Sequence, residues 1–159
     1  MSKAIYAGTF DPITYGHIDV ISRATKFFDH VVVGVSAGPK TTLFTHRERT
    51  ELVKAVFKDD SNIEVIGFSS LLVDFARSIG AQVIVRGMRA VSDFDYELQL
   101  TLMNRNLEPK IETIFLMPAE KYIFVSSSLA KEIAGLEGDI SKLVPPLVAK
   151  ALHKKIFKK

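Results

Sequence analysis

The stretch "AIYAGTFDPITYGH", residues 4–17, joins an apolar run to a segment with helical spacing through a loop rich in glycine and proline. Residues 4–8 are typical of a buried strand, and Ile18, Ile21 and Phe28 follow at the intervals of a helix over about residues 16–28. Histidine is a mediocre helix former and a poor cap, so His17 at the start of this helix indicates a role for its imidazole. A lone histidine is more often structural, and that alternative stays open here. The stretch predicts a strand, a loop and a helix in succession.

The same succession recurs along the chain. Four more apolar, β-branched runs stand at residues 30–36, 63–68, 82–87 and 113–118. Helical patterns follow these runs. One helix begins after Thr45 with a capping box to Glu48, and another, capped by Ser92 or Asp93, covers about residues 94–107. Further helices cover residues 71–79 and 126–135, and a last one follows Pro145 and Pro146. Strands that are apolar throughout suit a parallel sheet covered on both faces. We therefore expect a Rossmann-like, doubly wound, five-stranded parallel α/β sheet with helices on both faces, forming one domain over residues 1–159.

Composition narrows the class of protein. The 159 residues are 47% hydrophobic and 25% charged, which argues against disorder, and the chain has no cysteine for disulfides or thiolate chemistry. The net charge is +3, but four lysines stand in the last six residues, where a lysine-rich helix end is usually just solvated. We expect no nucleic-acid partner. Without a signal peptide or a membrane-spanning run, the sequence predicts a cytoplasmic protein with no membrane contact.

The residues that follow the predicted strands suit phosphate binding. Ligands bind such sheets outside the carboxyl ends of the strands. There the sequence places Thr9 and His17, the lone Lys40, the pair Arg86 and Arg89, and the serines 126–128. Two arginines across a Gly–Met step offer a fork for phosphate oxygens, and serines at a helix start offer hydroxyls and free backbone N–H groups. Each also has a plain structural alternative: a solvated lysine, surface ion pairs, an ordinary cap.

Several familiar catalytic motifs are missing from the sequence. No GxGxxG follows the first strand, no P-loop motif is present, and the four histidines are too scattered to indicate metal ligands. No Ser–His–Asp set shows itself. Without an obvious general base, the sequence favours a reaction whose nucleophile is already ionised.

Three motifs in order resemble the bacterial phosphopantetheine adenylyltransferases, a branch of the nucleotidyltransferase superfamily marked by an (H/T)xGH motif. They are "TYGH" at 14–17, "RGMRAVSDFDYELQ" at 86–99 and "VSSSLAK" at 125–131. Thr14 replaces the first histidine of the superfamily motif, as this branch has it, and Val125 stands where isoleucine is common. The similarity covers about residues 4–150. It implies transfer of AMP from ATP to 4′-phosphopantetheine, giving dephospho-coenzyme A and pyrophosphate.

The resemblance also implies roles for particular residues. His17 would stabilise the transition state, with Lys40 and Arg86 as further catalytic groups. Acceptor binding would involve Thr9, Lys40, Leu72 and Arg86. The residues that would frame ATP are Thr9, Phe10, His17, Gly87, Met88, Arg89, Glu97, Tyr122, Ile123, Phe124, Val125, Ser126, Ser127 and Ser128. Mg²⁺ would arrive with the ATP phosphates rather than in a protein metal site, and the family implies a homohexamer.

Two other interpretations stay open at this point. The same chemistry could serve another acceptor, as in nicotinamide mononucleotide adenylyltransferase or glycerol-phosphate cytidylyltransferase, although Thr14 and the "RGMR" segment count against both. A non-catalytic nucleotide sensor could use the same fold, but a sensor need not keep Thr9, His17, Lys40 and Arg86 together.

Overall fold

The structure, a computed structural model, describes residues 2–38 and 41–158. Within these residues five parallel strands form one sheet in the order β3-β2-β1-β4-β5. The strands are β1 (Lys3–Gly8), β2 (His30–Ser36), β3 (Ile63–Phe68), β4 (Val83–Gly87) and β5 (Glu112–Leu116). Every run predicted to be a strand forms one. The chain builds the sheet outward from β1 in one direction and then returns to add β4 on the other side of β1, so the switch point lies between β1 and β4.

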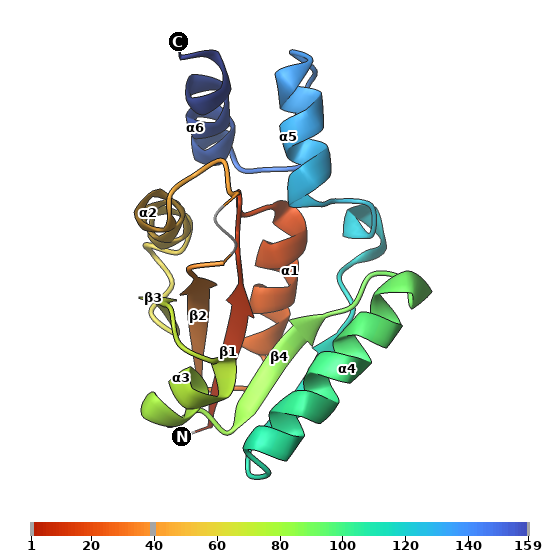
Figure 1. Ribbon diagram of the computed structural model, residues 1–159. Helices are drawn as coiled ribbons and strands as arrows, with labels where there is room; N and C mark the ends of the chain where they lie inside the picture. Colours follow the sequence, from red (N-terminus) through yellow and green to blue (C-terminus); the bar gives the residue numbers. More distant parts are fainter. Residues whose placement is uncertain (1, 39–40, 159) are drawn as a thin grey trace.

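Helices cover both faces of this sheet (Figure 1). Helices α1 (Tyr15–Ala24) and α2 (His46–Val56) pack on one face, in a core that includes Val31, Val33 and Val35 of β2. On the other face α3 (Leu72–Ser78) packs over Ile5 and Ile84, and α4 (Val91–Leu107) lies beside it. The predicted doubly wound parallel sheet with helices on both faces is confirmed.

The C-terminal helices lie beyond the sheet, at the end toward which the strands point (Figure 1). A short 3₁₀ turn, η1 (Glu120–Tyr122), which the sequence did not predict, leads into α5 (Ser127–Gly135). Helix α6 (Pro146–Phe157) contacts α5, and both join the core under α1 and α2. This arrangement brings the start of α5 to the carboxyl ends of the strands. Among the described residues, none of the helices has the length and apolar character needed to cross a bilayer.

Two predicted helix boundaries are wrong. Helix α1 ends at Ala24 rather than near Phe28, and residues 25–27 continue as a turn. Helix α4 begins at Val91 after an extended Ala90, not after Ser92 or Asp93. The Asp93 carboxylate instead reaches back from inside the first turn and accepts a hydrogen bond from the Arg89 backbone N–H at 3.3 Å. An acidic residue can therefore hold a helix start without occupying the cap position.

Helix α1 starts with a capping box in which histidine takes the place usually held by glutamate. Thr14 is the N-cap, and its hydroxyl oxygen accepts from the His17 backbone N–H. In return, His17 Nδ1 accepts from the Thr14 backbone N–H at 3.1 Å. The sequence rated histidine a poor cap, but the ring satisfies a backbone donor that the helix leaves unpaired. The capping box predicted for α2, between Thr45 and Glu48, is confirmed.

Candidate active site

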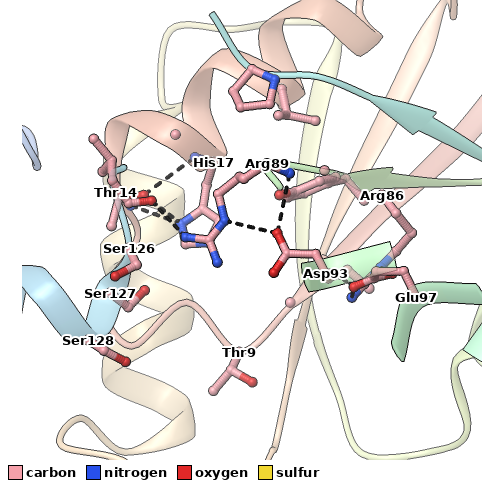
Figure 2. A pocket seen from close by; sticks show the side chains of 18 of the residues that line it. Thr9, Thr14, His17, Arg86, Arg89, Asp93, Glu97, Ser126, Ser127 and Ser128 are labelled. Carbon is pink, nitrogen blue, oxygen red and sulfur yellow. Dashed lines mark hydrogen bonds and ion pairs between the residues drawn. The ribbon is translucent and has the colours of Figure 1, made fainter. Parts of the chain in front are cut away.

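A cavity of about 450 Å³ opens at the carboxyl ends of β1 and β4, at the switch point of the sheet (Figure 2). Its lining comes from β1 and the loop after it, the first turn of α1, the end of β4, the first turns of α4 and the start of α5. The predicted site residues among the lining are Thr9, His17, Arg86, Gly87, Arg89, Glu97, Val125, Ser126, Ser127 and Ser128. The fold thus brings residues that are far apart in the sequence together around one cavity.

Other predicted residues lie outside this lining. Phe10 is buried with a positive φ of 51°, and its ring meets the His17 ring edge to face at 5.1 Å between centroids. The remaining ones are Leu72, Met88, Tyr122, Ile123 and Phe124. Lys40 lies outside the residues that the structure describes. The roles given to these residues by resemblance stay predictions.

His17 presents a neutral imidazole to the cavity. A backbone N–H can only donate, so Nδ1, which accepts from Thr14, carries no proton and the proton of the neutral ring sits on Nε2. Burial, together with the positive charges of Arg89 and Arg86, lowers the pKa of His17 to about 4. In the ligand-free protein at neutral pH, the ring is therefore a hydrogen-bond donor through Nε2 and has no lone pair left on Nδ1 for a substrate proton.

Arg86 is held rigidly at the end of β4. Its Nε and Nη2 donate to the two carboxylate oxygens of Glu97 at 2.8 and 2.6 Å, and Nη1 donates to the Ala7 carbonyl at 3.0 Å. Burial alone would lower the pKa of Arg86, but the hydrogen bonds and negative charge of Glu97 outweigh it and raise that pKa. The guanidinium is a fixed positive charge on the cavity wall, and Glu97 is the group that orients it.

Arg89 forms the second cation of the cavity wall. Its Nη1 donates to the Val125 carbonyl at 3.0 Å, and its Nε lies 3.6 Å from the Asp93 carboxylate. The bond to Val125 links the start of α4 to the segment that leads into α5. Arginine and carboxylate are thus paired twice along one side of the cavity, through Arg86 with Glu97 and Arg89 with Asp93.

The three serines have three different surroundings, on the side of the cavity opposite Arg86 in Figure 2. Ser126 is the N-cap of α5, since its Oγ accepts from the Leu129 backbone N–H at 3.1 Å. Ser127 Oγ donates to the Pro12 carbonyl at 2.7 Å and so ties α5 to the loop after β1. Ser128 is exposed and lines the cavity. Of these three serines, the structural alternative of an ordinary N-cap is correct for Ser126.

Sequence reasoning missed several lining residues, among them Tyr6, Asp93 and Tyr96. Helix positions i, i+3 and i+4 are held by Asp93, Tyr96 and Glu97, and this spacing puts the three side chains on one face of the helix. The predicted Glu97 could therefore have led to the other two. Tyr6 sits within an apolar strand and gives no such signal. Burial raises the pKa of Tyr6 to about 12, so its hydroxyl stays protonated at neutral pH.

Over residues 2–38 and 41–158, no three histidine, aspartate or glutamate side chains are grouped as a metal site. The cavity carboxylates Asp93 and Glu97 are both paired with arginines. The cavity accordingly offers fixed cations, N–H groups and hydroxyls, which are the donors that phosphate oxygens accept from.

Residues 5–133, which contain the whole described lining of this switch-point cavity, match the cytidylyltransferase-like family. Over 155 residues the chain is 55% identical to the phosphopantetheine adenylyltransferase of Methylobacillus flagellatus, covering 97% of each chain. The chain therefore belongs to the cytidylyltransferase-like family and, within it, to the phosphopantetheine adenylyltransferases.

Solved structures with the same fold are more distant in sequence. A protein from Vibrio parahaemolyticus assigned as a nicotinate-nucleotide adenylyltransferase superposes with a TM-score of 0.74 at 22% identity, over 96% of this chain and 99% of that one. The nicotinic acid mononucleotide adenylyltransferase of Plasmodium falciparum, complexed with NaAD, gives a TM-score of 0.72 at 18% identity, over 98% and 96%. At these identities the likeness establishes the fold alone.

Proposed function

We propose that this chain transfers the adenylyl group of ATP to 4′-phosphopantetheine, releasing dephospho-coenzyme A and pyrophosphate. The observation that carries the proposal is the 55% identity, over 97% of both chains, to a phosphopantetheine adenylyltransferase. The cavity supports it independently, because its fixed cations and N–H donors suit a reaction between two phosphate groups.

The reaction needs no general base. A phosphate monoester is largely dianionic at neutral pH, so one of its oxygens can attack the α-phosphorus of ATP without first losing a proton. The new bond joins that oxygen to the α-phosphorus, and the bond from the α-phosphorus to the bridging oxygen breaks as pyrophosphate leaves. This matches a cavity whose possible bases are engaged: His17 Nδ1 by Thr14, Glu97 by Arg86 and Asp93 by Arg89. Catalysis would then rest on alignment and on stabilising charge.

His17 would act on the α-phosphate through Nε2–H. Charge on the non-bridging oxygens is redistributed as the fifth oxygen approaches, so a donor fixed there acts more strongly on the transition state than on bound ATP. Arg86 and Lys40 would hold the acceptor phosphate with Thr9, while Arg89 and the serines at the start of α5 would hold the ATP phosphates. The other residues assigned by resemblance would extend the same two sub-sites.

Mg²⁺ would enter with ATP rather than bind a protein cage. The cavity carboxylates are already bonded to arginines, which fits a metal held by phosphate oxygens and not by side chains. When bound to ATP, the ion would neutralise charge on the departing pyrophosphate. Removing divalent metal with a chelator is expected to abolish turnover, and added Mg²⁺ to restore it.

We further propose that the chain forms a single domain that acts in the cytoplasm, without a nucleic-acid partner, as a homohexamer. Support for assembly comes from α4, which leaves large apolar side chains exposed on a surface helix: Phe94, Leu98, Leu102, Met103 and Leu107. Contiguous exposed apolar side chains are typical of a surface that meets another protein.

The deciding experiment is to supply the purified protein with ATP or CTP and a panel of acceptors, and to follow pyrophosphate. We expect turnover with ATP and 4′-phosphopantetheine and none with unphosphorylated pantetheine. Preference for nicotinamide mononucleotide, or for CTP with glycerol phosphate, would reassign the acceptor. Tight ATP binding with no product from any acceptor would favour a nucleotide sensor.

A further inference from the structure

Arg49 is a charged residue at a buried helix position where an apolar side chain would be usual. It precedes Leu52, Val53 and Val56 on α2 at helical intervals, so it heads the apolar stripe of that helix. Its side chain is among the largest fully buried ones, with 0% exposure. Burying a guanidinium is unfavourable unless its donors are satisfied, so the sequence keeps this cation for a reason that packing alone does not supply.

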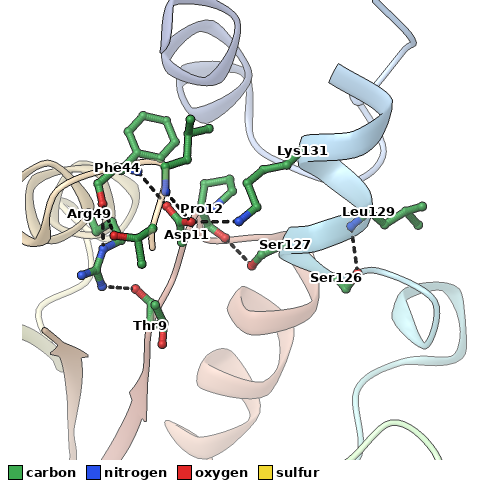
Figure 3. A network of polar contacts seen from close by, with 11 residues as sticks. Thr9, Asp11, Pro12, Phe44, Arg49, Ser126, Ser127, Leu129 and Lys131 are labelled. Atoms are coloured by element: carbon green, nitrogen blue, oxygen red, sulfur yellow. Dashed lines mark hydrogen bonds and ion pairs between the residues drawn. The ribbon is translucent and has the colours of Figure 1, made fainter. Parts of the chain in front are cut away.

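The donors of Arg49 bond to backbone carbonyls of three separate segments. Figure 3 shows the bonds to Thr9 and Phe44. Nη1 donates to Thr9 at 2.5 Å and to Ser36 at 2.7 Å, and Nη2 donates to Ala37 at 2.7 Å. Nε donates to the Phe44 carbonyl at 3.2 Å. One planar group thus joins the exit of β1, the exit of β2 and the approach to α2. Burial lowers the pKa of Arg49, and the nearby charge of Asp11 opposes that effect.

The third segment is fixed from its other side by Asp11. The carboxylate of Asp11 accepts from the backbone N–H groups of Leu43 and Phe44, both at 2.9 Å. Phe44 is therefore held through its N–H by Asp11 and through its C=O by Arg49. Lys131 of α5 also donates to Asp11, at 2.9 Å, which connects this network to the serine side of the cavity.

We propose that Arg49 is a positioning residue for the acceptor half of the cavity. Thr9 lines the cavity, and Arg49 holds its carbonyl next to those of Ser36, at the end of β2, and Phe44, before α2. The inference rests on the proposed function, in which Thr9 contacts the phosphate of 4′-phosphopantetheine. The ATP half has further anchors of its own, Arg89 to Val125 and Ser127 to Pro12. Loss of the Arg49 fork should thus weaken binding of the acceptor more than binding of ATP.

The test compares Arg49→Lys and Arg49→Gln with Val53→Ala. Lysine keeps the charge, but its compact ammonium cannot reach carbonyls on three segments as a fork does. Val53 lies one turn further along α2 in the same core, so its truncation disturbs the packing of the helix and leaves the Arg49 hydrogen bonds to the loops in place. KM for phosphopantetheine, KM for ATP and the thermal midpoint are measured for each. In both Arg49 variants we expect KM for phosphopantetheine to rise by about tenfold or more and KM for ATP to change by less than about threefold.

The outcomes separate positioning from general destabilisation. Val53→Ala is expected to lower the thermal midpoint while leaving both KM values near those of the wild type. Equal effects of the Arg49 variants on both substrates, or an Arg49→Lys chain with wild-type KM values, would overturn the inference. If the wild-type chain makes no product from phosphopantetheine, the proposed function fails instead.

A measurement on the wild-type chain decides the matter if the Arg49 variants do not fold. The Arg49 Nε–H proton can be followed by NMR during titration. We expect its resonance to shift on addition of phosphopantetheine and to stay in place on addition of ATP. A shift with ATP alone, or with neither substrate, would overturn the positioning role.

Discussion

The two nitrogens of the His17 ring have different surroundings. Nδ1 completes the N-terminal cap of α1 by accepting from Thr14, and this bond leaves the proton on Nε2, toward the cavity. The structural interpretation of this histidine is confirmed, and the cap sets the tautomer that the proposed donor role, which stays a prediction, requires. The sequence indicated an unusual residue at the helix start, but the partner that fixes the ring was not visible in it.

Two substitutions test the donor apart from the cap. Asparagine can place its side-chain oxygen near the position of Nδ1 and lacks the Nε2 donor, whereas glutamine can bring an amide N–H to the Nε2 position and can also close a capping box at this position. We expect His17→Asn to fold with wild-type stability, to bind ATP normally and to lose about 10²–10³ in kcat, the usual cost of one preorganised donor. His17→Gln should keep more activity than His17→Asn, and its stability should also stay near that of the wild type, because glutamine closes the same capping box.

Steady-state kinetics, ATP titration calorimetry and urea unfolding measure these three effects. Because His17 is assigned as a donor and not as a base, raising the pH should not rescue the asparagine variant. Near-wild-type turnover of His17→Asn would return this residue to a purely structural role.

The lowered pKa of His17 also predicts how stability depends on pH. The neutral ring is favoured in the fold, with a pKa of about 4 against the ordinary 6.5. Its contribution to stability is complete above pH 6.5 and is lost as the pH falls toward 4, because the unfolded chain takes up the proton first. The loss corresponds to roughly 3 kcal/mol at most. Urea unfolding of the ligand-free protein between pH 7 and 4 should show a steeper fall for the wild type than for His17→Asn. Parallel curves would contradict the burial of this ring.

At the scale of elements, the unit formed by β4 and α4 carries the cations of the cavity together with their counter-ions. Arg86 ends the strand, Glu97 stands in the helix, and the pair forms only when the helix packs back over the strand. The sequence indicated both residues, and assigned Glu97 to ATP. The structure pairs Glu97 with Arg86, and its assignment to ATP stays a prediction. Such pairings depend on the angle between two elements, which local spacing does not determine.

Removing Arg86 should have two consequences that a second substitution can separate. Arg86→Gln leaves the 8% exposed Glu97 as an unpaired buried carboxylate, which costs about 3–5 kcal/mol. It also removes charge-assisted hydrogen bonds to the acceptor phosphate, so KM for phosphopantetheine should rise by tens-fold. Lys40→Ala, at a position outside the described residues, is expected to weaken acceptor use in the same way.

The control is the double variant with Glu97→Gln, in which neither partner is charged. It should recover most of the thermal midpoint that Arg86→Gln loses and none of the KM for phosphopantetheine. Recovery of both quantities would make Arg86 a structural residue only.

The surroundings of the serines at the start of α5 predict different effects of substituting Ser126 and Ser128. Ser126→Ala removes the N-cap bond to Leu129 and should cost about 1 kcal/mol of stability. Ser128→Leu places bulk where the ATP phosphates are expected, so it should raise the dissociation constant for ATP more than that for the acceptor and leave stability nearly unchanged. Calorimetric titration with each substrate and urea unfolding give both values. Normal ATP binding by Ser128→Leu would reduce the triplet to an ordinary cap.

Across the chain, the sequence predicted most of the strands and helices, which follow from the periodicity of apolar residues, and fewer of the side-chain partners, which depend on contacts between distant segments. All five strands and the parallel sheet follow from runs such as residues 30–36, because a strand buried on both faces must be apolar throughout. Arg49 shows the limit. Its position on an apolar stripe was readable, but its four carbonyl partners come from segments that only the folded sheet brings together. The end of α1 and the turn η1 were missed for the same reason.

Helix α4 presents apolar side chains that predict assembly of the chain. Its Leu102 and Met103 are more than half exposed, and a 17-residue helix with so little apolar burial gains little from packing on its own sheet. Further copies of the chain would cover this face in the proposed homohexamer, for which sedimentation velocity should give a mass near six times the 17.7 kDa of one chain. Leu102→Glu with Met103→Glu should lower that mass while circular dichroism stays unchanged, since these side chains face outward.

Phe27→Glu is the matched control, because Phe27 is an equally exposed apolar residue that lies just beyond α1. It should leave the sedimenting mass unchanged. A wild-type protein that sediments as a monomer at all concentrations would contradict the hexamer. A hexamer that survives both glutamates would place the interface on another face of the molecule. In either case the cavity, whose described lining comes from one chain, could still be tested for turnover in the same preparation.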